Sequence, residues 1–215
     1  MLPCLNSQGM NKQTYLYGAG GHGKVVLEIL QLDTQKVAGF FDDSASIPKQ
    51  ILGIPFLGSF KQELLHKDDN LIITVGNNSI RKKITTSLLV SFARAIHKNT
   101  YVSPSVRVEL GTVIMSGVSI NASTTIGNHV IINTNASIDH DCCIGDFANV
   151  SPNACLSGSV TVGEGTHVGA GAVVIPEVYI GKWATIGAGA VITKDVPDYA
   201  VVVGNPGKII KYTHE

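Results

Sequence analysis

A six-residue repeat fills the second half of this chain and constrains its fold more than any other feature. Every sixth position from 102 to 192 is aliphatic, and the residue four places after each is small or β-branched. An α-helix repeats every 3.6 residues and a flat strand every two, so neither returns to one face at this interval. The aliphatic positions are Val102, Val108, Ile114, Ile120, Ile126, Ile132, Ile138, Ile144, Val150, Leu156, Val162, Val168, Val174, Ile180, Ile186 and Ile192.

A triangular coil satisfies this period. Three short strands joined by turns close one coil of eighteen residues with the aliphatic side chains stacked inside, so the sixteen units predict roughly five coils. Residues directly after the aliphatic positions are expected at corners with unusual backbone angles. These are Gly127, Asn133, Asp139, Gly145, Gly163, Gly169, Gly181 and Gly187. A sandwich with evenly spaced strands is the alternative, but its variable loops would break the phase.

The repeat resembles the left-handed parallel β-helix of the hexapeptide-repeat acyltransferases, from about Tyr101 to about Val203. The resemblance implies a fold more specifically than a reaction, because relatives include sugar, serine and antibiotic acetyltransferases and a zinc carbonic anhydrase. No long loop interrupts the phase between Val102 and Ile192. An active site in this half therefore has to be built from residues at the turns.

The first hundred residues predict a small α/β layer. A strand at Thr14–Tyr17 is followed by the glycine-rich run 18–23 and by a helix over 24–32. Glycines before a helix expose free N–H groups and the positive end of the dipole, which suits a phosphate. A second strand, 36–41, ends in Asp42-Asp43, where dinucleotide-binding folds place an acidic residue on a ribose. The alternative is that these glycines only allow tight packing of strand and helix.

A third unit has the same order. Its strand, 71–75, is followed by Gly76 and by a helix from Ser79 to about Phe92, so three glycine-rich ends would meet in one crevice. Residues up to 99 hold eleven basic and seven acidic side chains, against five and nine in the remainder. This excess favours a phosphorylated substrate. The layer is too short for a full dinucleotide fold and suits a single nucleotide better than NAD.

The two halves together resemble the sugar acyltransferases of the sialic acid and bacillosamine pathways, which N- or O-acetylate amino sugars. Four stretches carry the resemblance: 17–23, 41–43, 76–83 and 133–142. It implies a nucleotide-sugar-binding Rossmann-like domain over 1–99 and a left-handed β-helix acyltransferase domain with a C-terminal tail over 100–215. The residues that match the nucleotide-sugar contacts of the UDP-amino-sugar members are Gly20, Gly21, His22, Asp42, Asp43 and Gly76.

The same resemblance makes His140 the catalytic base and Asp141 its acidic neighbour. A sugar ammonium must lose a proton before it attacks a thioester, and imidazole, with a pKa near 6.5, takes that proton near neutral pH. A carboxylate orients the ring and stabilises the imidazolium. The alternative for His140 is a solvated turn histidine. His129 and His167 are expected at the surface.

The acetyl donor is expected to be acetyl-CoA. By resemblance it would run past Gly158, Ala170 and Ala188, with contacts mainly to the backbone. Relatives of the bacillosamine type contact the donor through a second histidine nine residues after the base, where this chain has Asn149. An asparagine donates a hydrogen bond to a thioester carbonyl but supplies no proton. Relatives are trimers with the donor between subunits, so we expect a homotrimer in which Asn149 or Ala170 acts across an interface.

The sequence thus predicts an acetyl-CoA-dependent N-acetyltransferase acting on a nucleotide-linked 4-amino-4,6-dideoxy sugar. A sialic acid O-acetyltransferase and a noncatalytic sugar-binding scaffold remain alternatives. Covalent transfer through Cys142 or Cys143 is less favoured than direct transfer, because Cys142 occupies an inward position. The histidine spacing of the zinc carbonic anhydrases is absent, so no metal is predicted. An NAD-dependent oxidoreductase would leave the repeats without chemistry.

Composition bears on further classes. Sixteen basic and sixteen acidic residues cancel, so the basic excess of a nucleic-acid binder is missing. No apolar run reaches the length of a membrane span and the N-terminus lacks a secretion profile, so we expect a cytoplasmic protein with free cysteines. Residues 1–9, ahead of Met10, are expected to be a mobile extension.

Overall fold

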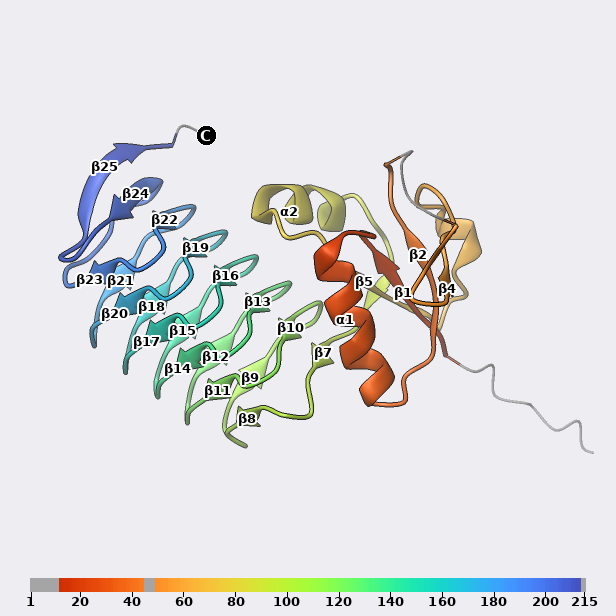
Figure 1. Cartoon of the computed structure of the whole chain (residues 1–215), viewed down its shortest axis with the longest axis horizontal. Helices are drawn as coiled ribbons and strands as arrows, with labels where there is room; N and C mark the ends of the chain where they lie inside the picture. Colours follow the sequence, from red (N-terminus) through yellow and green to blue (C-terminus); the bar gives the residue numbers. More distant parts are fainter. Residues whose placement is uncertain (1–11, 45–48, 214–215) are drawn as a thin grey trace, which may run out of the picture.

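The computed structural model describes residues 12–44 and 49–213 and contains two parts, an N-terminal α/β layer and a three-sided prism of short strands (Figure 1). The expected extension over 1–9 lies outside the described residues.

The N-terminal layer is built on a parallel four-stranded sheet in the order β2-β1-β5-β6. Its central strands are almost fully buried because they consist of aliphatic and aromatic residues that pack on both faces of the sheet. The bounds are β1 Thr14–Tyr17, α1 Gly21–Leu32, β2 Val37–Phe41, β3 Gln50–Ile51, β4 Ile54–Pro55, a 3-10 turn Gln62–Leu64, β5 Asn70–Ile73, α2 Asn78–Thr86 and β6 Ser91–Phe92.

Both helices differ from their predicted lengths. Helix α1 begins at Gly21, which places His22 and Gly23 in its first turn. Helix α2 ends at Thr86 instead of continuing to Phe92. It ends there because the hydroxyls of Thr85 and Ser87 donate to carbonyls of the preceding turn, at 2.8 and 2.7 Å, and because Ser91–Phe92 pairs with β5 as strand β6.

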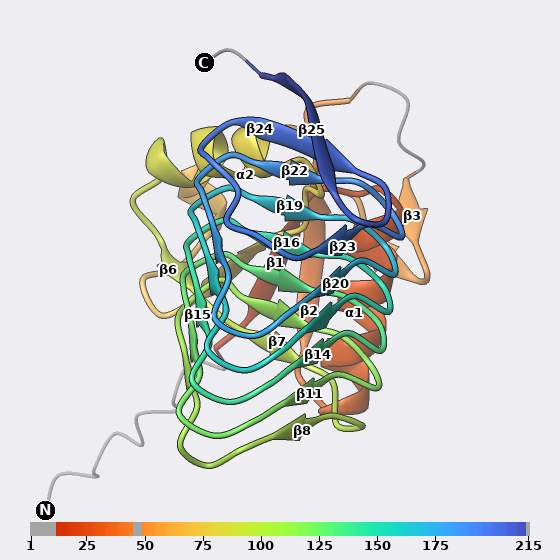
Figure 2. The same cartoon turned by 90° about the vertical axis from the view of Figure 1, so that its left-hand side faces the viewer.

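The repeat folds into a prism whose three faces are parallel rows of two-residue strands, one row for each side (Figure 2). Face I contains β7 Ala95–Ile96, β10 Val113–Ile114, β13 Ile131–Ile132, β16 Asn149–Val150, β19 His167–Val168, β22 Thr185–Ile186 and β24 Ala200–Val203, followed by antiparallel β25 Lys208–Tyr212. Face II contains β8 Tyr101–Val102, β11 Ser119–Ile120, β14 Ser137–Ile138, β17 Cys155–Leu156, β20 Val173–Val174 and β23 Val191–Ile192. Face III contains β9 Arg107–Val108, β12 Thr125–Ile126, β15 Cys143–Ile144, β18 Thr161–Val162 and β21 Tyr179–Ile180.

The predicted inward positions form one continuous core. From Ile114 onward the repeating aliphatic residues are at most 2% exposed. Five complete coils are present before β22, β23 and β24 extend faces I and II. The prism begins at Ala95, a few residues ahead of the predicted start near Tyr101, since Ile96 stands six residues before Val102 and already continues the phase.

The predicted corner geometry was wrong by two residues. Positive φ angles occur three residues after the aliphatic position, as at Ser123, Asn135 and Asp141, and not at the residue directly after it. The glycines directly after the aliphatic residues are required for a reason other than a positive φ. A Cβ on Gly145 would lie 2.7 Å from the backbone nitrogen of Glu164 in the next coil. These glycines therefore permit close contact between coils.

The N-terminal layer covers one side of the prism. Helix α1 lies beside β7 (Figure 1), where its apolar side chains pack with Ala95, Val113 and Ile131 on the outside of face I. Helix α2 meets the edge between faces III and I, and Asn78 Nδ2 donates to Gly165 O at 3.0 Å. The prism thus presents face I and its edge with face III to the layer.

Candidate active site

His140 lies in the turn that joins β14 to β15, on the edge between faces II and III, and its side chain is 57% exposed. The turn is fixed by Asp139, whose Oδ1 accepts the backbone N–H of His140 at 2.8 Å and Nδ2 of Asn121 at 2.7 Å. Asn121 stands one coil earlier at the same position of the repeat. The imidazole therefore projects from a rigid corner into solvent.

Asp141 orients the ring. Nδ1 of His140 lies 2.7 Å from Oδ2 of Asp141. An ionised carboxylate only accepts hydrogen bonds, so the neutral ring carries its proton on Nδ1 and leaves Nε2 free as a base. The hydrogen bond with Asp141, and then the charge of Asp139, raise the pKa of His140. This arrangement meets the geometric requirement for a general base oriented by a carboxylate.

The imidazole of His140 packs against Gly158 in the next coil. A Cβ on Gly158 would lie 2.7 Å from Cε1 and 2.8 Å from Nε2 of His140. Any larger residue at 158 would therefore displace the imidazole. A small cavity of about 200 Å³ lies beside this turn on face II, lined by Ser119, Asn121, Asp139 and neighbouring residues.

The cysteines next to His140 differ in accessibility. Cys142 is 2% exposed, and its Sγ donates to Ser157 O at 3.2 Å. Burial raises the pKa of its thiol, which makes it a poor nucleophile. Cys143 is exposed on β15, and within the described residues it forms no disulfide with Cys142 or Cys155.

The glycines after β1 divide into two groups. Gly18, at φ 122°, and Gly23 are packed so closely that a Cβ would lie 2.6 Å from Thr74 O and 2.2 Å from Gly18 O, respectively. Those two glycines serve the packing of strand and helix. Apart from chain neighbours and the backbone of α1 itself, no atom of the described residues lies within 4 Å of the Cβ position at Gly20 or Gly21, nor at Gly76 after β5. Open space therefore remains in front of the first turn of α1.

This open region has the chemistry of an anion site. Gly20 is the N-cap of α1 and supplies no side-chain cap, so the first N–H groups of the helix are available. Asp42 and Asp43 follow β2 at the same end of the sheet. Asp42 accepts the N–H of Ala19 at 2.8 Å, and Asp43 accepts the Tyr17 hydroxyl at 2.7 Å. We call the region formed by Gly20, Gly21, Asp42, Asp43 and Gly76 the glycine edge.

His22 lies next to the glycine edge in the first turn of α1. Burial, and then the charge of Arg81, lower the pKa of His22 to about 4, so its ring is neutral. Its Nε2 is buried and has no hydrogen-bond partner among the described residues. Asn149, on β16 of face I, is also buried, and its Oδ1 lacks a partner in the same described part of the chain.

The expectation of a surface position was wrong for His129 and holds only in part for His167. His129 is 4% exposed; it stacks on Phe147 with ring centroids 5.4 Å apart and meets Phe92 edge to face at 4.6 Å. It is buried because its turn lies on the edge that the N-terminal layer covers. His167 is half-buried on face I, where Nε2 lies 3.2 Å from the Ser151 hydroxyl.

A single chain does not bring all the predicted site residues together. Gly158 shares the edge between faces II and III with His140, whereas Ala170 and Ala188 lie exposed on the edge between faces I and II. Asn149 lies on face I. In a three-sided prism the edge between faces II and III is opposite face I, on which the N-terminal layer sits. His140 therefore points away from the glycine edge of its own chain.

Arg81, Asn121 and Asp139 are not among the site residues predicted from the sequence, although Arg81 and Asp139 each contact one that is, and Asn121 contacts Asp139. Arg81 lies in the stretch 76–83 that carries the family resemblance, but no role of its own was predicted for it, and it is 1% exposed. Asp139 was expected only as a corner residue, and no role was predicted for Asn121. Their separation of eighteen residues, one full coil, is the signal that would have placed them side by side next to His140.

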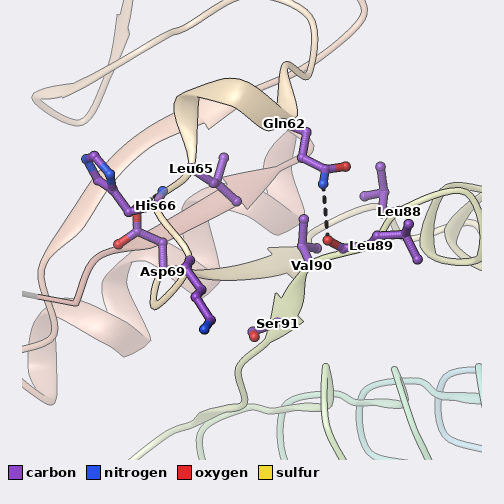
Figure 3. Close-up of a pocket in the computed structure, with 9 residues that line it drawn as sticks. Gln62, Leu65, His66, Asp69, Leu88, Leu89, Val90 and Ser91 are labelled. Carbon is purple, nitrogen blue, oxygen red and sulfur yellow. Dashed lines mark hydrogen bonds between the residues drawn. The ribbon is translucent and has the colours of Figure 1, made fainter.

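A separate cavity of about 510 Å³ lies at the outer edge of the N-terminal sheet (Figure 3). It is lined by Leu65, Leu88, Val90 and neighbours, and Gln62 Nε2 donates to Leu89 O at 3.3 Å. None of the predicted site residues lines it.

Over 12–44 and 49–213, no group of three or more His, Cys, Asp or Glu side chains is placed to hold a metal ion. No helix within those ranges has the length and apolarity to cross a membrane.

Comparison with known proteins identifies both parts of the chain. Residues 13–88 match the family described as the PglD N-terminal domain, and residues 159–194 match the bacterial transferase hexapeptide repeats. A UDP-N-acetylbacillosamine N-acetyltransferase of Bacillus subtilis is 39% identical over 112 residues, which are 49% of this chain and 52% of that protein. The chain spans about half the length, or less, of the curated relatives it matches.

Solved structures match over nearly the whole chain. PerB from Caulobacter crescentus, in complex with CoA and GDP-perosamine, has a TM-score of 0.87 and 38% identity, covering 93% of this chain and 97% of that one. The acetyltransferase domain of PglB from Neisseria gonorrhoeae, in complex with acetyl coenzyme A, has a TM-score of 0.86 and 35% identity, covering 94% and 100%. These matches confirm the predicted Rossmann-like sheet followed by a left-handed parallel β-helix. The chain therefore belongs to the hexapeptide-repeat nucleotide-sugar N-acetyltransferases.

Proposed function

We propose that this protein transfers the acetyl group of acetyl-CoA directly to the amine of a nucleotide-linked 4-amino-4,6-dideoxy sugar, with His140 as general base. The observation that carries the proposal is the exposed imidazole, whose Nδ1 lies 2.7 Å from Asp141 Oδ2 and whose Nε2 has no hydrogen-bond partner among the described residues. Relatives crystallised with CoA and GDP-perosamine, or with acetyl coenzyme A, support both substrate classes.

The chemistry requires one proton relay. Nε2 of His140 takes a proton from the sugar amine as its nitrogen bonds to the carbonyl carbon of the thioester. The carbon–sulfur bond breaks, and the imidazolium returns the proton to the departing sulfur, so that an amide and a thiol are formed. Asp141 and Asp139 stabilise the imidazolium in between, which is the same effect that raises the pKa of His140.

The glycine edge is proposed to hold the nucleotide sugar, within the domain over 1–99. The free N–H groups at Gly20 and Gly21 and the positive end of α1 suit its phosphates. Asp42 and Asp43 lie beside them as acceptors for hydroxyl groups, with Gly76 leaving the third side open. His22 lies beside this site, and because its ring is neutral it adds no charge there.

The donor is proposed to lie along the prism, within the domain over 100–215. Gly158, Ala170 and Ala188 present little side chain, so coenzyme A would contact mainly their backbone. Asn149 has an amide whose Oδ1 is unpartnered, and its Nδ2 is the group suited to a thioester carbonyl.

The positions of these groups favour a homotrimer with shared sites. Since His140 points away from the glycine edge of its own chain, a sugar held there is within reach of the base only if a second chain supplies it. A closed trimer supplies each site with a base from one chain and a glycine edge from the next. We also propose a cytoplasmic location, which the free cysteines Cys142, Cys143 and Cys155 support.

The function is tested by an acetyl-transfer screen. Wild-type protein is incubated with acetyl-CoA and UDP-, GDP- or dTDP-linked 4-amino-4,6-dideoxy sugars, or with free sialic acid, and thiol release is followed. We expect turnover with one nucleotide-linked amino sugar and a product stable to hydroxylamine, as an amide is. A hydroxylamine-labile product from sialic acid would establish the O-acetyltransferase alternative. Sugar binding without thiol release would establish the scaffold.

The shared site is tested by mixing two inactive variants. His140→Ala lacks the base, and Gly20→Asp places a carboxylate in the anion site. Co-refolded at equal amounts, the two form mixed trimers in which about a quarter of the sites combine an intact base with an intact glycine edge. Recovery of that fraction supports the shared site, whereas a mixture as inactive as each variant alone would refute it.

A further inference from the structure

Arg81 is the most deeply buried charged side chain of the molecule as described. It projects from α2 into the junction with the prism, where it is 1% exposed. Burial lowers the pKa of its guanidinium to about 10, which leaves it charged at neutral pH. A buried cation normally needs a carboxylate, but none of the hydrogen-bond acceptors of Arg81 in the described residues is one.

Uncharged oxygens satisfy all five N–H donors of the guanidinium. Nε and Nη2 reach into the prism, and Nη1 reaches the turn after β5. The acceptors are His129 O at 2.9 Å, Val75 O at 2.9 Å, Gly76 O at 3.1 Å, Asn78 Oδ1 at 3.0 Å and Phe147 O at 2.7 Å, with Ala148 O farther away at 3.5 Å. The planar fork of arginine fits such a fixed set of directions, and an ammonium group does not.

These contacts join the two halves of the proposed site. Gly76 belongs to the glycine edge, and Phe147 and Ala148 directly precede Asn149, the proposed donor contact. His129 and Phe147 lie one coil apart on the same edge of the prism, so one guanidinium spans two successive coils. One side chain therefore ties the turn at Gly76 to two coils of the prism, in addition to the packing of α1 on face I and the bond from Asn78 to Gly165 O.

We propose that Arg81 is a positioning residue, which holds the turn at Gly76 in fixed register with the two coil turns that precede Ile131 and Asn149. The effect of Arg81 on catalysis rests on the proposed function. Its effect on the register between the layer and the prism rests on the hydrogen bonds alone. Its role is to keep the nucleotide sugar at the correct distance from the transfer site.

Arg81→Lys is the decisive variant, because it keeps the charge and loses the fork. A lysine has three donors at one point, so it cannot serve both the turn at Gly76 and the two coils. Arg94→Lys is the matched control, because it makes the same chemical change at an exposed arginine that takes no part in the hydrogen bonds of Arg81. Asn78→Ala is a milder second variant, which removes one acceptor of Arg81 and the bond from Asn78 to Gly165 O.

Steady-state kinetics are measured with the nucleotide-linked amino sugar that wild type acetylates. For Arg81→Lys we expect kcat/KM for the sugar to fall by roughly 10- to 100-fold, the loss typical of a displaced substrate. KM for acetyl-CoA should stay within about twofold of wild type, because strand β16, which carries Asn149, keeps its pairing with β13 and β19. Asn78→Ala should change the same parameter in the same direction by less. Equal losses for both substrates would overturn the assignment, as would kinetics equal to those of Arg94→Lys.

Hydrogen exchange provides a readout that does not depend on turnover. In full-length Arg81→Lys, amides in 74–80, 128–132 and 146–150 should exchange faster together, whereas those in 184–202 should not change. If the wild-type protein acetylated no sugar, the proposed function would be refuted, but the exchange experiment would still test the positioning role of Arg81. Exchange as slow as in Arg94→Lys, or faster over the whole prism, would overturn the positioning role.

Discussion

The imidazole of His140 rests directly against Gly158, one coil further along the same edge of the prism. The position of a Cβ at 158 lies 2.7 Å from Cε1 and 2.8 Å from Nε2 of the ring. Both distances are well inside van der Waals contact, so the ring keeps its place only while residue 158 is glycine. Together with the hydrogen bond from Nδ1 to Asp141, this contact defines where Nε2 points.

Gly158→Ala should therefore reduce activity with little effect on folding. The methyl group forces the ring away, and kcat should fall by roughly 10²-fold, as expected for a misplaced catalytic group. The melting temperature should change little, because Gly158 has no positive φ that an alanine would strain. Steady-state assays and thermal melts measure the two effects. A variant with wild-type kcat would show that the ring is not used in this position.

Two substitutions distinguish direct acetyl transfer from covalent transfer through Cys143. His140→Ala should lower kcat by roughly 10²–10⁴-fold, the range for loss of a general base. Cys143→Ala should keep nearly full turnover, since the exposed thiol has no part in direct transfer. Intact-mass spectrometry after mixing the protein with acetyl-CoA alone tests for a covalent intermediate. Acetylation of the wild-type protein that is lost in Cys143→Ala would contradict direct transfer.

Asp141→Asn should move the acid limb of the pH profile. The hydrogen bond to Asp141 is the main cause of the raised pKa of His140. The base is active when neutral, above its pKa, so removing the carboxylate lowers that pKa and shifts the fall of kcat/KM to lower pH. The plateau should also drop, because an amide no longer enforces the tautomer with Nε2 free. Glu177→Gln, an exposed carboxylate two coils further along the same edge, should shift neither.

The stability of the protein should fall as the pH drops below about 6.5, the reference pKa of histidine. Burial, and then the charge of Arg81, lower the pKa of His129 to about 4, while Asp146 opposes the shift. Protons then bind the unfolded chain more readily, so stability is full above the unfolded pKa and is lost as the pH falls towards 4. Full protonation of His129 would cost about 3 kcal/mol.

His129→Phe tests this linkage with urea unfolding at several pH values. The phenyl ring keeps the contacts with Phe92 and Phe147 and removes a buried Nδ1 that has no partner within the described residues. We expect unchanged or slightly higher stability at pH 7 and a flatter decline between pH 6.5 and 4. A decline as steep as that of wild type would assign the linkage to other groups, His22 first among them.

The two groups of glycines after β1 should respond differently to alanine. Gly20→Ala meets open space, so the fold should persist while KM for the nucleotide sugar rises, because the methyl group faces the anion site. Gly18→Ala should instead lower the melting temperature, since φ is 122° and Thr74 O lies in the way. Thermal melts and sugar titrations of both variants compare them directly. An equal effect on stability would mean that both glycines serve packing.

The prism could be predicted almost completely because its evidence is local. Each aliphatic residue from Ile114 to Ile192 occupies the interior, and the cysteine at 142 is packed inward as its place in the repeat required. The corner angles were misassigned because a glycine has two uses, and sequence spacing does not separate a positive φ from a close contact between coils. Gly145 illustrates the second use. The early end of α2 escaped prediction because Thr85 and Ser87 bond back onto the helix, which composition does not reveal.

By itself the sequence determined the three-sided prism, the glycine-bearing α/β layer and the presence of His140 and Asp141 at a corner, since short-range spacing dictates which side chains face inward. Only the tertiary structure decided that His129 is buried, that Arg81 joins layer to prism, and that His140 faces away from the glycine edge. Those facts depend on which side of the prism the layer covers. That choice arises from contacts between residues far apart in the chain, such as Arg81 with Phe147, and no local period encodes it.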